Sequence, residues 1–344
     1  MKSRYDSIIC GAGLSGSLLA HCLRMKGEKV LIYDAQKSTR QHMTAWWAKD
    51  SDAILTSNWK WKNFGLIDEK GRYYNKTLSQ YVYKATWNND LLEELKKGSD
   101  FVQKNLSDDD LIQLSLSNTD AKLFDGRYVQ PKEDKHEINQ IFYGQVLEYD
   151  HEHVYHEPVL FDLRPGKGKE PIFSYILPLS KNRLFVELVS FIKADVKSLH
   201  QKYLQQNNLT NGKVVFVESG LTPLFQYNRK IDNKITEIGI RGGILRPSNG
   251  YGMPYFLKDA QLLANSSHYQ RGSLTKILDA IFLKAIKRET SVNVGILSAM
   301  SAKFSGDEIF AFMDENYSLK RLLKLLLCLR PLKVLRFVLF NIRN

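Results

Sequence analysis

The hydrophobic pattern at the start of the chain predicts a strand, a helix and a second strand in close succession. Apolar residues run through Tyr5–Cys10, and a glycine-rich stretch follows them. Apolar positions with helical spacing then continue until Gly27, a residue type that commonly ends a helix. A second apolar run, Val30–Tyr33, leads into Asp34. This order is typical of the first βαβ unit of a nucleotide-binding domain.

The glycine-rich stretch has the spacing that brings a backbone close to a pyrophosphate. Gly11 permits a tight turn, Gly13 lets a ligand approach, and Gly16 lets the helix pack closely on the strand. Asp34 lies where a carboxylate accepts hydrogen bonds from a ribose hydroxyl. NAD and FAD are bound through the same device, so this stretch alone does not choose between them. The residues predicted to bind the cofactor are Gly11, Ala12, Gly13, Leu14, Ser15, Gly16 and Asp34.

After Asp34 the alternation of helices and strands gives way to short strand-like pieces. Two helical patterns interrupt them, near Asp90–Lys97 and Ser107–Ser115, and the acidic run Asp108–Asp110 suits a helix N-terminus. The main strand-like pieces are Tyr73–Tyr74, Tyr81–Ala85, Gln140–Tyr149, Val159–Leu163, Ile172–Leu177 and Arg183–Phe191. We therefore expect an α/β fold in which a mixed or antiparallel sheet is inserted into a Rossmann-type domain.

The expected division of the chain gives the nucleotide-binding domain two pieces, residues 1–70 and 192–265. A substrate-binding β-sheet domain occupies residues 71–191, and residues 266–344 form a C-terminal helical region. A second glycine-rich stretch, residues 239–264, lies in the second nucleotide-binding piece. Its backbone either approaches a ligand or simply turns sharply.

Composition changes this picture mainly at the C-terminus. The net charge is +12, and the segment from Asn316 to the end holds seven basic residues and no acidic one. The rest of the chain has no basic stripe interleaved with aromatic residues, which argues against nucleic-acid binding. Three scattered cysteines do not make a disulfide framework, and the chain opens without a signal-peptide pattern, so we expect a cytoplasmic protein. The pattern leaves the oligomeric state open.

The basic tail, which begins at Ser318, carries apolar residues at helical spacing. One face of its first half holds Leu319, Leu322, Leu323 and Leu326. Pro331 breaks the pattern, and a second amphipathic piece follows. Several basic residues would lie inside any span of about 20 residues, which excludes a transmembrane helix. The tail is therefore either a pair of helices that closes the soluble core or a basic amphipathic element that lies on anionic lipid.

Glu187 is unusual because it lies in a strand pattern that is apolar on both faces. Phe185 and Val189 share its face, and the opposite face is apolar as well. Burial raises the pKa of a carboxyl group, so that it keeps its proton near neutral pH and serves as a general acid. The alternative is a structural glutamate that is hydrogen-bonded or paired with Arg183 or Arg164.

Eight pieces of the chain resemble, in the same order, segments of the bacterial and plant lycopene cyclases, which are FAD-containing flavoproteins of carotenoid synthesis. They span most of the chain and are GAGLSGSLLA with Asp34, MTAWWA at 43–48, LFDGRYVQ at 123–130, INQIFYGQVLEY at 138–149, PVLFDLRP at 158–165, FSYILPLSKNRLFVEL at 173–188, ESGLTPLF at 218–225 and GIRGGILRPSNGYGMP at 239–254. The resemblance implies an FAD site that the second glycine-rich stretch completes with Gly243, Pro247, Gly250 and Tyr251.

The resemblance also implies a reaction. Such a cyclase turns the end of a linear polyene, as in lycopene, into a ring by proton addition, ring closure and proton loss, without net oxidation. It assigns the acid to Glu187, and it implies reduced FAD as a stabiliser of the cation, with NAD(P)H needed only to reduce the flavin. Asp162 and Arg164 occupy alternate positions of one strand. We expect them either to orient Glu187 or the flavin, with Asp162 as an acceptor of the departing proton, or to form a plain salt bridge.

A carotene resides in the bilayer, so this reaction favours the membrane interpretation of the tail. We then expect peripheral attachment to the cytoplasmic membrane face, with the tail beside the mouth of the substrate pocket.

Two other classes of protein stay open on the sequence. One is a redox flavoprotein, such as a polyprenyl reductase or a monooxygenase acting on a lipid-like substrate. The other is a non-catalytic, membrane-associated nucleotide-binding protein. No metal site is predicted, because the histidines at 151, 153 and 156 lie in a hydrated strand end. Four tryptophans line either an apolar tunnel or the ordinary core: Trp46, Trp47, Trp59 and Trp61.

Overall fold

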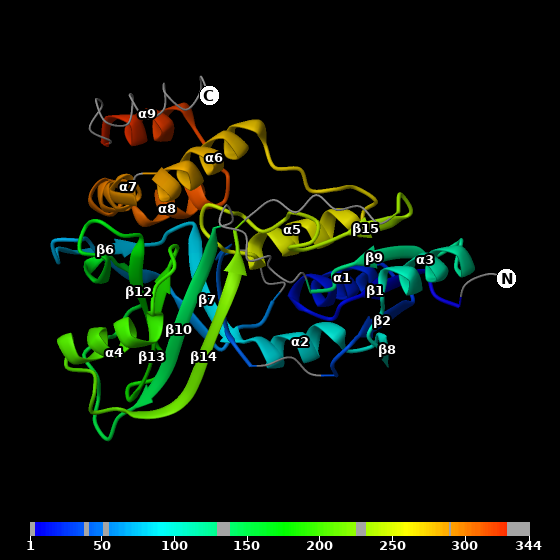
Figure 1. Cartoon of the computed structure of the whole chain (residues 1–344), viewed down its shortest axis with the longest axis horizontal. Helices are drawn as coiled ribbons and strands as arrows, with labels where there is room; N and C mark the ends of the chain where they lie inside the picture. Colours follow the sequence, from blue (N-terminus) through cyan, green and yellow to red (C-terminus); the bar gives the residue numbers. More distant parts are fainter. Residues whose placement is uncertain are drawn as a thin grey trace.

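Three β-sheets and their covering helices make up the described chain. The structure is a computed structural model, and it describes residues 4–37, 41–50, 55–128, 138–224, 232–288 and 290–328 (Figure 1). Its sheets have five parallel, seven mixed and three antiparallel strands. The predicted α/β fold, with a Rossmann-type parallel sheet and additional antiparallel strands, is confirmed.

The parallel sheet carries the first glycine-rich stretch at its centre. In spatial order its strands are β15 (Ile235–Glu237), β9 (Lys122–Asp125), β1 (Ser7–Cys10), β2 (Val30–Asp34) and β8 (Asp100–Gln103). β1 leads through the glycines into α1 (Leu14–Met25), and Gly27, whose φ is +84°, follows the end of this helix. α1 packs against α5 (Met253–Leu263), the helix that forms the second half of the second glycine-rich stretch (Figure 1). The two stretches therefore belong to one packed unit.

The seven-stranded sheet separates two hydrophobic clusters. Its order is β14 (Lys213–Pro223), β10 (Asn139–Glu148), β13 (Arg183–Ser190), β12 (Ile172–Pro178), β11 (Val159–Asp162), β5 (Asn63–Ile67) and β6 (Tyr73–Thr77). Val186 and Leu188 pack on α4 (Val196–Gln206), whereas Phe185 and Val189 join the main core on the other face. β13 is thus apolar on both faces, as its sequence predicts.

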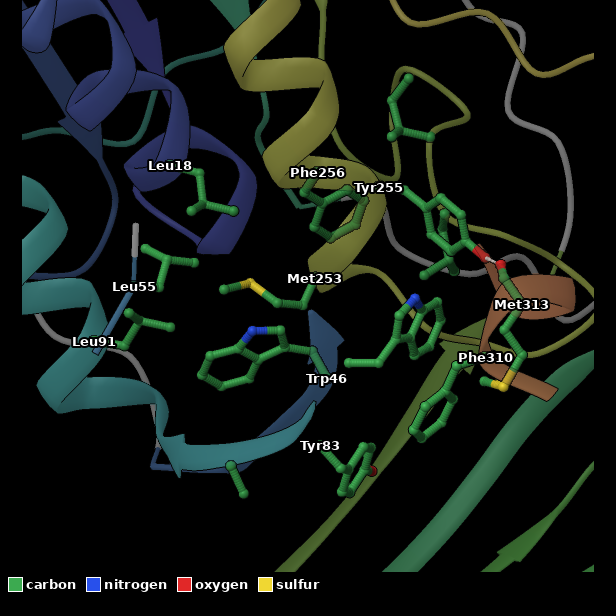
Figure 2. Packing of buried hydrophobic residues seen from close by; sticks show 14 of the residues in the cluster. Leu18, Trp46, Leu55, Tyr83, Leu91, Met253, Tyr255, Phe256, Phe310 and Met313 are labelled. Carbon is green, nitrogen blue, oxygen red and sulfur yellow. Dashed lines mark hydrogen bonds between the residues drawn. The ribbon is translucent and has the colours of Figure 1, made fainter. Parts of the chain in front are cut away.

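The main core fills the space between the large sheet, the small sheet and the C-terminal helices. The small sheet has the order β3 (Met43–Lys49), β7 (Tyr81–Trp87) and β4 (Trp59–Trp61). The helices are α6 (Ser273–Arg288), α7 (Thr290–Lys303) and α8 (Gly306–Met313). Phe310 of α8 stacks on Tyr83, with ring centroids 5.8 Å apart (Figure 2).

Two of the tryptophans belong to this core. Trp46 and Trp47 are each 2% exposed, and Trp46 lies among Leu55, Leu91 and Met253 (Figure 2). The ordinary core role that the sequence left open therefore describes Trp46 and Trp47.

Strand pairing crosses the expected boundaries of the substrate segment. β8 and β9 lie within residues 71–191, yet they pair in the parallel sheet. β14 lies beyond residue 191, yet it pairs with β10 in the large sheet. Periodicity indicates that a strand exists, but its partner depends on contacts far away in the sequence.

Three further helices complete the described chain. α2 (Asn88–Lys96) and α3 (Asp108–Ser117) follow the predicted helical patterns, and Ser107 with Asp110 forms a capping box at the acidic start of α3. α9 (Leu319–Cys328) is the first half of the basic tail, and the second half lies outside the described residues. Within the described ranges, no helix is long and apolar enough to cross a membrane.

Candidate active site

Only glycine fits at two positions of the first glycine-rich stretch. Gly11 has a φ of +105°, and a Cβ there would lie 2.5 Å from the backbone of Gly126. A Cβ on Gly16 would lie 1.9 Å from the carbonyl oxygen of Gly11. Gly13 differs, because a Cβ there would meet no protein atom within 4 Å. The chain is therefore tightly closed around the turn but open at Gly13, where a ligand has room to approach.

A cavity of about 780 Å³ opens beside this turn. The ends of the parallel strands line it, together with Gly239–Arg241 from the second glycine-rich stretch. Asp34 also lines the cavity, and its Oδ2 accepts a hydrogen bond of 2.6 Å from the backbone N–H of Ala12. The predicted carboxylate thus lies directly against the turn. We call this space the dinucleotide cavity.

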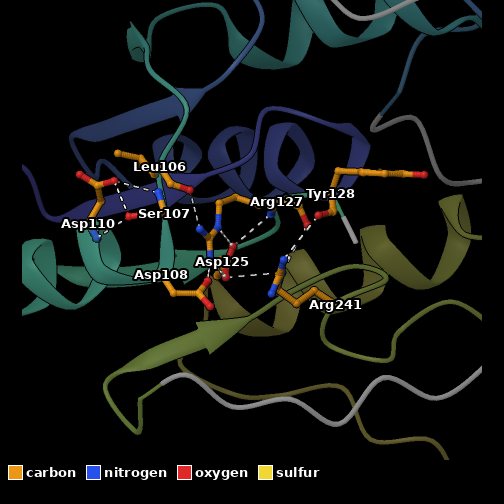
Figure 3. A network of polar contacts seen from close by, with 8 residues as sticks. All are labelled: Leu106, Ser107, Asp108, Asp110, Asp125, Arg127, Tyr128 and Arg241. Atoms are coloured by element: carbon orange, nitrogen blue, oxygen red, sulfur yellow. Dashed lines mark hydrogen bonds and ion pairs between the residues drawn. The ribbon is translucent and has the colours of Figure 1, made fainter. Parts of the chain in front are cut away.

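Two arginines that the sequence analysis did not single out form one wall of the dinucleotide cavity. Arg127 donates to both oxygens of the buried Asp125, each at 2.9 Å, and to Asp108 at 2.8 Å (Figure 3). Arg241 lies 3.4 Å from the same Asp125. The network fixes both guanidinium groups beside the glycine turn, in the lining of the dinucleotide cavity. Each arginine lies in a glycine-containing segment, Arg127 in residues 123–130 and Arg241 in residues 239–254. This location in the sequence could have indicated that they lie close to the cofactor.

A second cavity, of about 580 Å³, contains the predicted acid. Glu187 lines it together with Gly250 and Tyr251, and Tyr128 lines both this cavity and the dinucleotide cavity. The two cavities are therefore adjacent. We call this second space the acid cavity. Gly243 and Pro247, which were also predicted to contact the cofactor, line neither of the two cavities in the described chain.

A second carboxyl group meets Glu187 across the sheet. Gly144 of β10 pairs with Glu187 on β13 at one side and with Glu218 on β14 at the other. Because Gly144 has no side chain, the two carboxyl groups lie next to each other above it, and they are hydrogen-bonded. Burial, the charge of Glu218 and this hydrogen bond raise the pKa of Glu187 well above its ordinary value.

Glu218 has a hydrogen-bond donor of its own and an imidazole nearby. It is 2% exposed, and its Oε2 accepts a hydrogen bond of 2.8 Å from the backbone N–H of Met43. Nδ1 of His42 lies 3.8 Å from the same oxygen. In the sequence, Glu218 lies in a segment that resembles the family, residues 218–225, and no role was predicted for it. The sequence feature that could have indicated Glu218 is the one that indicated Glu187, namely a carboxylate within a strand-like pattern.

Tyrosine hydroxyl groups adjoin Glu187 and Glu218, which we call the acid pair. Tyr175, on the neighbouring strand β12, pairs with Glu187 of β13. The hydroxyl of Tyr175 lies 2.6 Å from that of Tyr83. The hydroxyl of Tyr83 lies 3.2 Å from that of Tyr251. Burial raises the pKa of all three, to about 12 for Tyr251, so they are neutral hydrogen-bonding groups at physiological pH.

The far side of the acid cavity is apolar and aromatic. Phe173 contacts Phe161 and Phe191 with ring centroids 5.0 and 6.0 Å apart. A smaller cavity of about 110 Å³ continues from this side under α7 and α8, and Phe161, Phe282 and Leu297 line both spaces. The acid cavity therefore has a polar side, with the two glutamates and the tyrosines, and an apolar aromatic side opposite them.

Asp162 and Arg164 lie on the other face of the sheet. Asp162 pairs with Ser174 of β12, whereas Glu187 pairs with the next residue, Tyr175. Because successive side chains of a strand point to opposite faces, the side chain of Asp162 points away from Glu187 and toward α4. There it is fully buried, bonded to Arg164 and to the hydroxyl of Tyr203 at 2.7 Å. Of the two interpretations left open, this is the plain salt bridge. The structure does not bring the pair to Glu187, because the register turns it away from the acid cavity.

The arginines proposed as structural partners of Glu187 are engaged elsewhere. Arg183 pairs with Glu148 at 2.7 Å, and Arg164 pairs with Asp162. The histidine segment forms no metal site in the part of the chain that is described.

Comparison with known proteins identifies the family. A family profile described as lycopene cyclase protein matches residues 6–321. The chain belongs to the lycopene cyclase family. The resemblance noted in the sequence is confirmed at this level.

Relatives within this lycopene cyclase group are distant. The chain is 23% identical over 302 residues to a chloroplastic neoxanthin synthase of Solanum tuberosum, a match that covers 77% of this chain and 61% of the relative. It is 22% identical over 304 residues to a lycopene beta-cyclase of Pantoea ananas, covering 77% and 75%. The chain thus spans about three fifths of the length of the plant relative.

Solved structures share the fold of this lycopene cyclase family member at low identity. A geranylgeranyl bacteriochlorophyll reductase-like protein of Thermoplasma acidophilum has a TM-score of 0.58 at 13% identity, covering 97% of this chain and 99% of that one. The flavin-dependent brominase Bmp2 has a TM-score of 0.53 at 13% identity, covering 97% and 93%. These likenesses concern the architecture alone.

The raised pKa of Glu187 predicts a pH-dependent cost to folding. An unfolded glutamate releases its proton near pH 4.3, whereas folded Glu187 holds it to higher pH, so its contribution to stability is intact below about pH 4 and is lost as the pH rises. Glu187→Gln has no proton to hold. Its free energy of unfolding relative to wild type should increase with pH above 4, by up to about 1.4 kcal/mol per unit.

Urea unfolding between pH 4 and 8 measures this difference. Glu93→Gln, at an exposed glutamate of α2, is the control and should show a pH-independent difference. Parallel curves for wild type and Glu187→Gln would show that Glu187 titrates normally in the folded protein.

Proposed function

We propose that this protein is a carotenoid cyclase that closes the end of a linear, lycopene-like polyene into a ring by acid catalysis, without net oxidation. The observation that carries the proposal is Glu187, a carboxyl group with a raised pKa that faces the aromatic wall of a cavity beside the dinucleotide cavity. Membership of the lycopene cyclase family supports the same reaction class.

FAD is the cofactor we propose for the dinucleotide cavity. The residues there fit it: Gly11 and Gly16 hold a turn that no side chain could share, Gly13 faces open space, and Asp34 lies beside the turn. Arg127 and Arg241 lie where they would offset pyrophosphate charge. When bound in its reduced form, the flavin supplies a negatively charged ring that stabilises a nearby cation, and NAD(P)H serves only as its reductant.

The chain's own residues account for the remaining requirements of the reaction. Glu187 holds a proton near neutral pH and donates it to the terminal double bond of the polyene. The apolar wall around Phe173 excludes water that would otherwise trap the cation. The faces of aromatic rings on this wall attract positive charge and so favour the cationic stage of ring closure.

The shape of the cavities favours a long apolar substrate. The acid cavity and the smaller cavity beneath α7 and α8 share Phe161, Phe282 and Leu297, so together they extend the apolar space away from Glu187. A polyene with its end at Glu187 would pass these side chains.

Expression in a host that accumulates linear carotenoid tests the function, with chromatography of the pigments. Wild type should form cyclic product, and Glu187→Gln should lose roughly 10²-fold or more of this activity because it keeps shape and hydrogen bonding without a transferable proton. Flavin content should be unchanged. Substrate-dependent consumption of NAD(P)H or oxygen in step with product would instead mark a redox flavoprotein.

Gly13→Val tests the placement of FAD. A Cβ at this position meets no protein atom within 4 Å, so the variant should fold, but its side chain would occupy the path of the pyrophosphate. Flavin absorbance of the purified variant should fall several-fold while its unfolding midpoint without flavin stays close to that of wild type. Full flavin occupancy in the variant would rule out this placement.

We further propose that α9 attaches the protein to the cytoplasmic face of a membrane. Its leucines at 319, 323, 326 and 327 are 75%, 50%, 57% and 81% exposed, which is costly in water but favourable in lipid. Leu325, on the inner side, is buried and packs in the core. Lys320 and Arg321 flank the exposed leucines and suit an anionic lipid surface.

Flotation with anionic liposomes at low and high salt tests this attachment. The double variant Leu323→Gln, Leu327→Gln should float several-fold less than wild type, since both side chains lose apolar contact with lipid. Leu116→Gln, at a 59% exposed leucine of α3, is the matched control and should float like wild type. Equal flotation of all three proteins, or none, would contradict the proposal.

A further inference from the structure

Ring closure needs a base as well as an acid, and the acid pair offers two carboxyl groups with different surroundings. Glu218 accepts a hydrogen bond from the backbone N–H of Met43, and His42 lies nearby. The hydrogen-bond partner of Glu187 is Glu218 itself. When the pair holds a single proton, the raised pKa of Glu187 favours its placement on Glu187.

The positions of the two groups are fixed by three strands. Glu187, Gly144 and Glu218 form one row across β13, β10 and β14, and both carboxylates line the acid cavity. A Cβ at Gly144 would lie 3.3 Å from the Cβ of Glu187 and 3.0 Å from the ring of Phe185. The absence of a side chain at Gly144 therefore keeps open the space in which the two groups meet.

We propose that Glu218 is the base that removes the ring proton after Glu187 has donated the first one. This rests on the proposed cyclase function. The O–H bond of Glu187 breaks as a C–H bond forms at the terminal alkene, and the neighbouring alkene supplies the electron pair of the new ring C–C bond. A C–H bond beside the resulting cation then breaks. Its proton goes to the carboxylate of Glu218, and its electron pair becomes the ring double bond.

The pair begins and ends the reaction with one proton. After turnover that proton is on Glu218, and transfer across the hydrogen bond between the two carboxyl groups returns it to Glu187. No oxidant or reductant is consumed. The location of Glu218 has a second consequence: a fixed base reaches one of the C–H bonds that flank the cation, so it selects the position of the ring double bond.

Pigment analysis of Glu218→Gln tests the proposal beside Glu187→Gln and wild type. Glu187→Gln should form almost no ring. Glu218→Gln should make the wild-type ring isomer roughly 10²-fold more slowly, and its residual product should include isomers with a displaced double bond or rings that carry a hydroxyl from water. Because the charge of Glu218 raises the pKa of Glu187, the alkaline limit of the residual activity should also move to lower pH.

Val217→Thr, at an exposed neighbour on β14, is the control and should behave as wild type. Formation of the wild-type isomer by Glu218→Gln at a rate close to that of wild type, with an unchanged pH profile, would overturn the role of Glu218. Absence of cyclic product from wild type would overturn the proposed function itself.

A further variant covers failure of Glu218→Gln to fold or to bind flavin. Glu218→Asp keeps the carboxylate but withdraws it by one methylene. Slower formation of the same isomer by this variant would support the proposal, and wild-type activity would overturn it.

Discussion

The contact between Glu187 and Glu218 is the constraint on which the site depends. Two ionised carboxylates side by side in this cavity repel each other, so the fold favours the state in which one keeps its proton. The same proximity that costs folding free energy therefore keeps a proton on one carboxyl group, and this proton is available for transfer. The surrounding structure maintains the condition, because the register of β13, β10 and β14 keeps the two glutamates in one row while a backbone N–H holds one partner.

A buried arginine connects this site to the C-terminal helices. Arg246 lies within the second glycine-rich stretch and is 3% exposed. Its guanidinium donates to Asp279 of α6 at 3.1 Å and to the carbonyl oxygen of Met313, at the end of α8, at 2.8 Å. The helices that cover the apolar cavities are thereby joined to the segment that borders the dinucleotide cavity. Removing one charge from such a buried network generally costs several kcal/mol. The network therefore holds α6 and α8 firmly in place over the cavities.

The sequence was informative where a feature is local. The turn from Gly11 to Gly16, the acid at position 34 and the doubly apolar strand around Glu187 all follow from spacing within one or two elements, and the structure has them in these places. It was uninformative where a feature depends on register. Asp162 and Arg164 were correctly paired with each other, but the face they occupy is set by pairing with β12. Glu218 became a partner of Glu187 only through Gly144, and no periodicity within β14 indicates this.

The row of Glu187, Gly144 and Glu218 also determines when, during synthesis, the site comes into existence. β10 pairs with β13 and with β14, and β14 is the last strand of this sheet along the chain. A chain that has emerged only as far as Glu187 contains the acid without the neighbour that perturbs it, and β10 still presents an open edge. Contacts between residues so far apart in sequence form later than local contacts, because closing the long intervening loop costs conformational entropy. An incomplete or misfolded chain would therefore carry an ordinary glutamate, and the carboxyl group that keeps its proton to higher pH would appear only with the finished sheet.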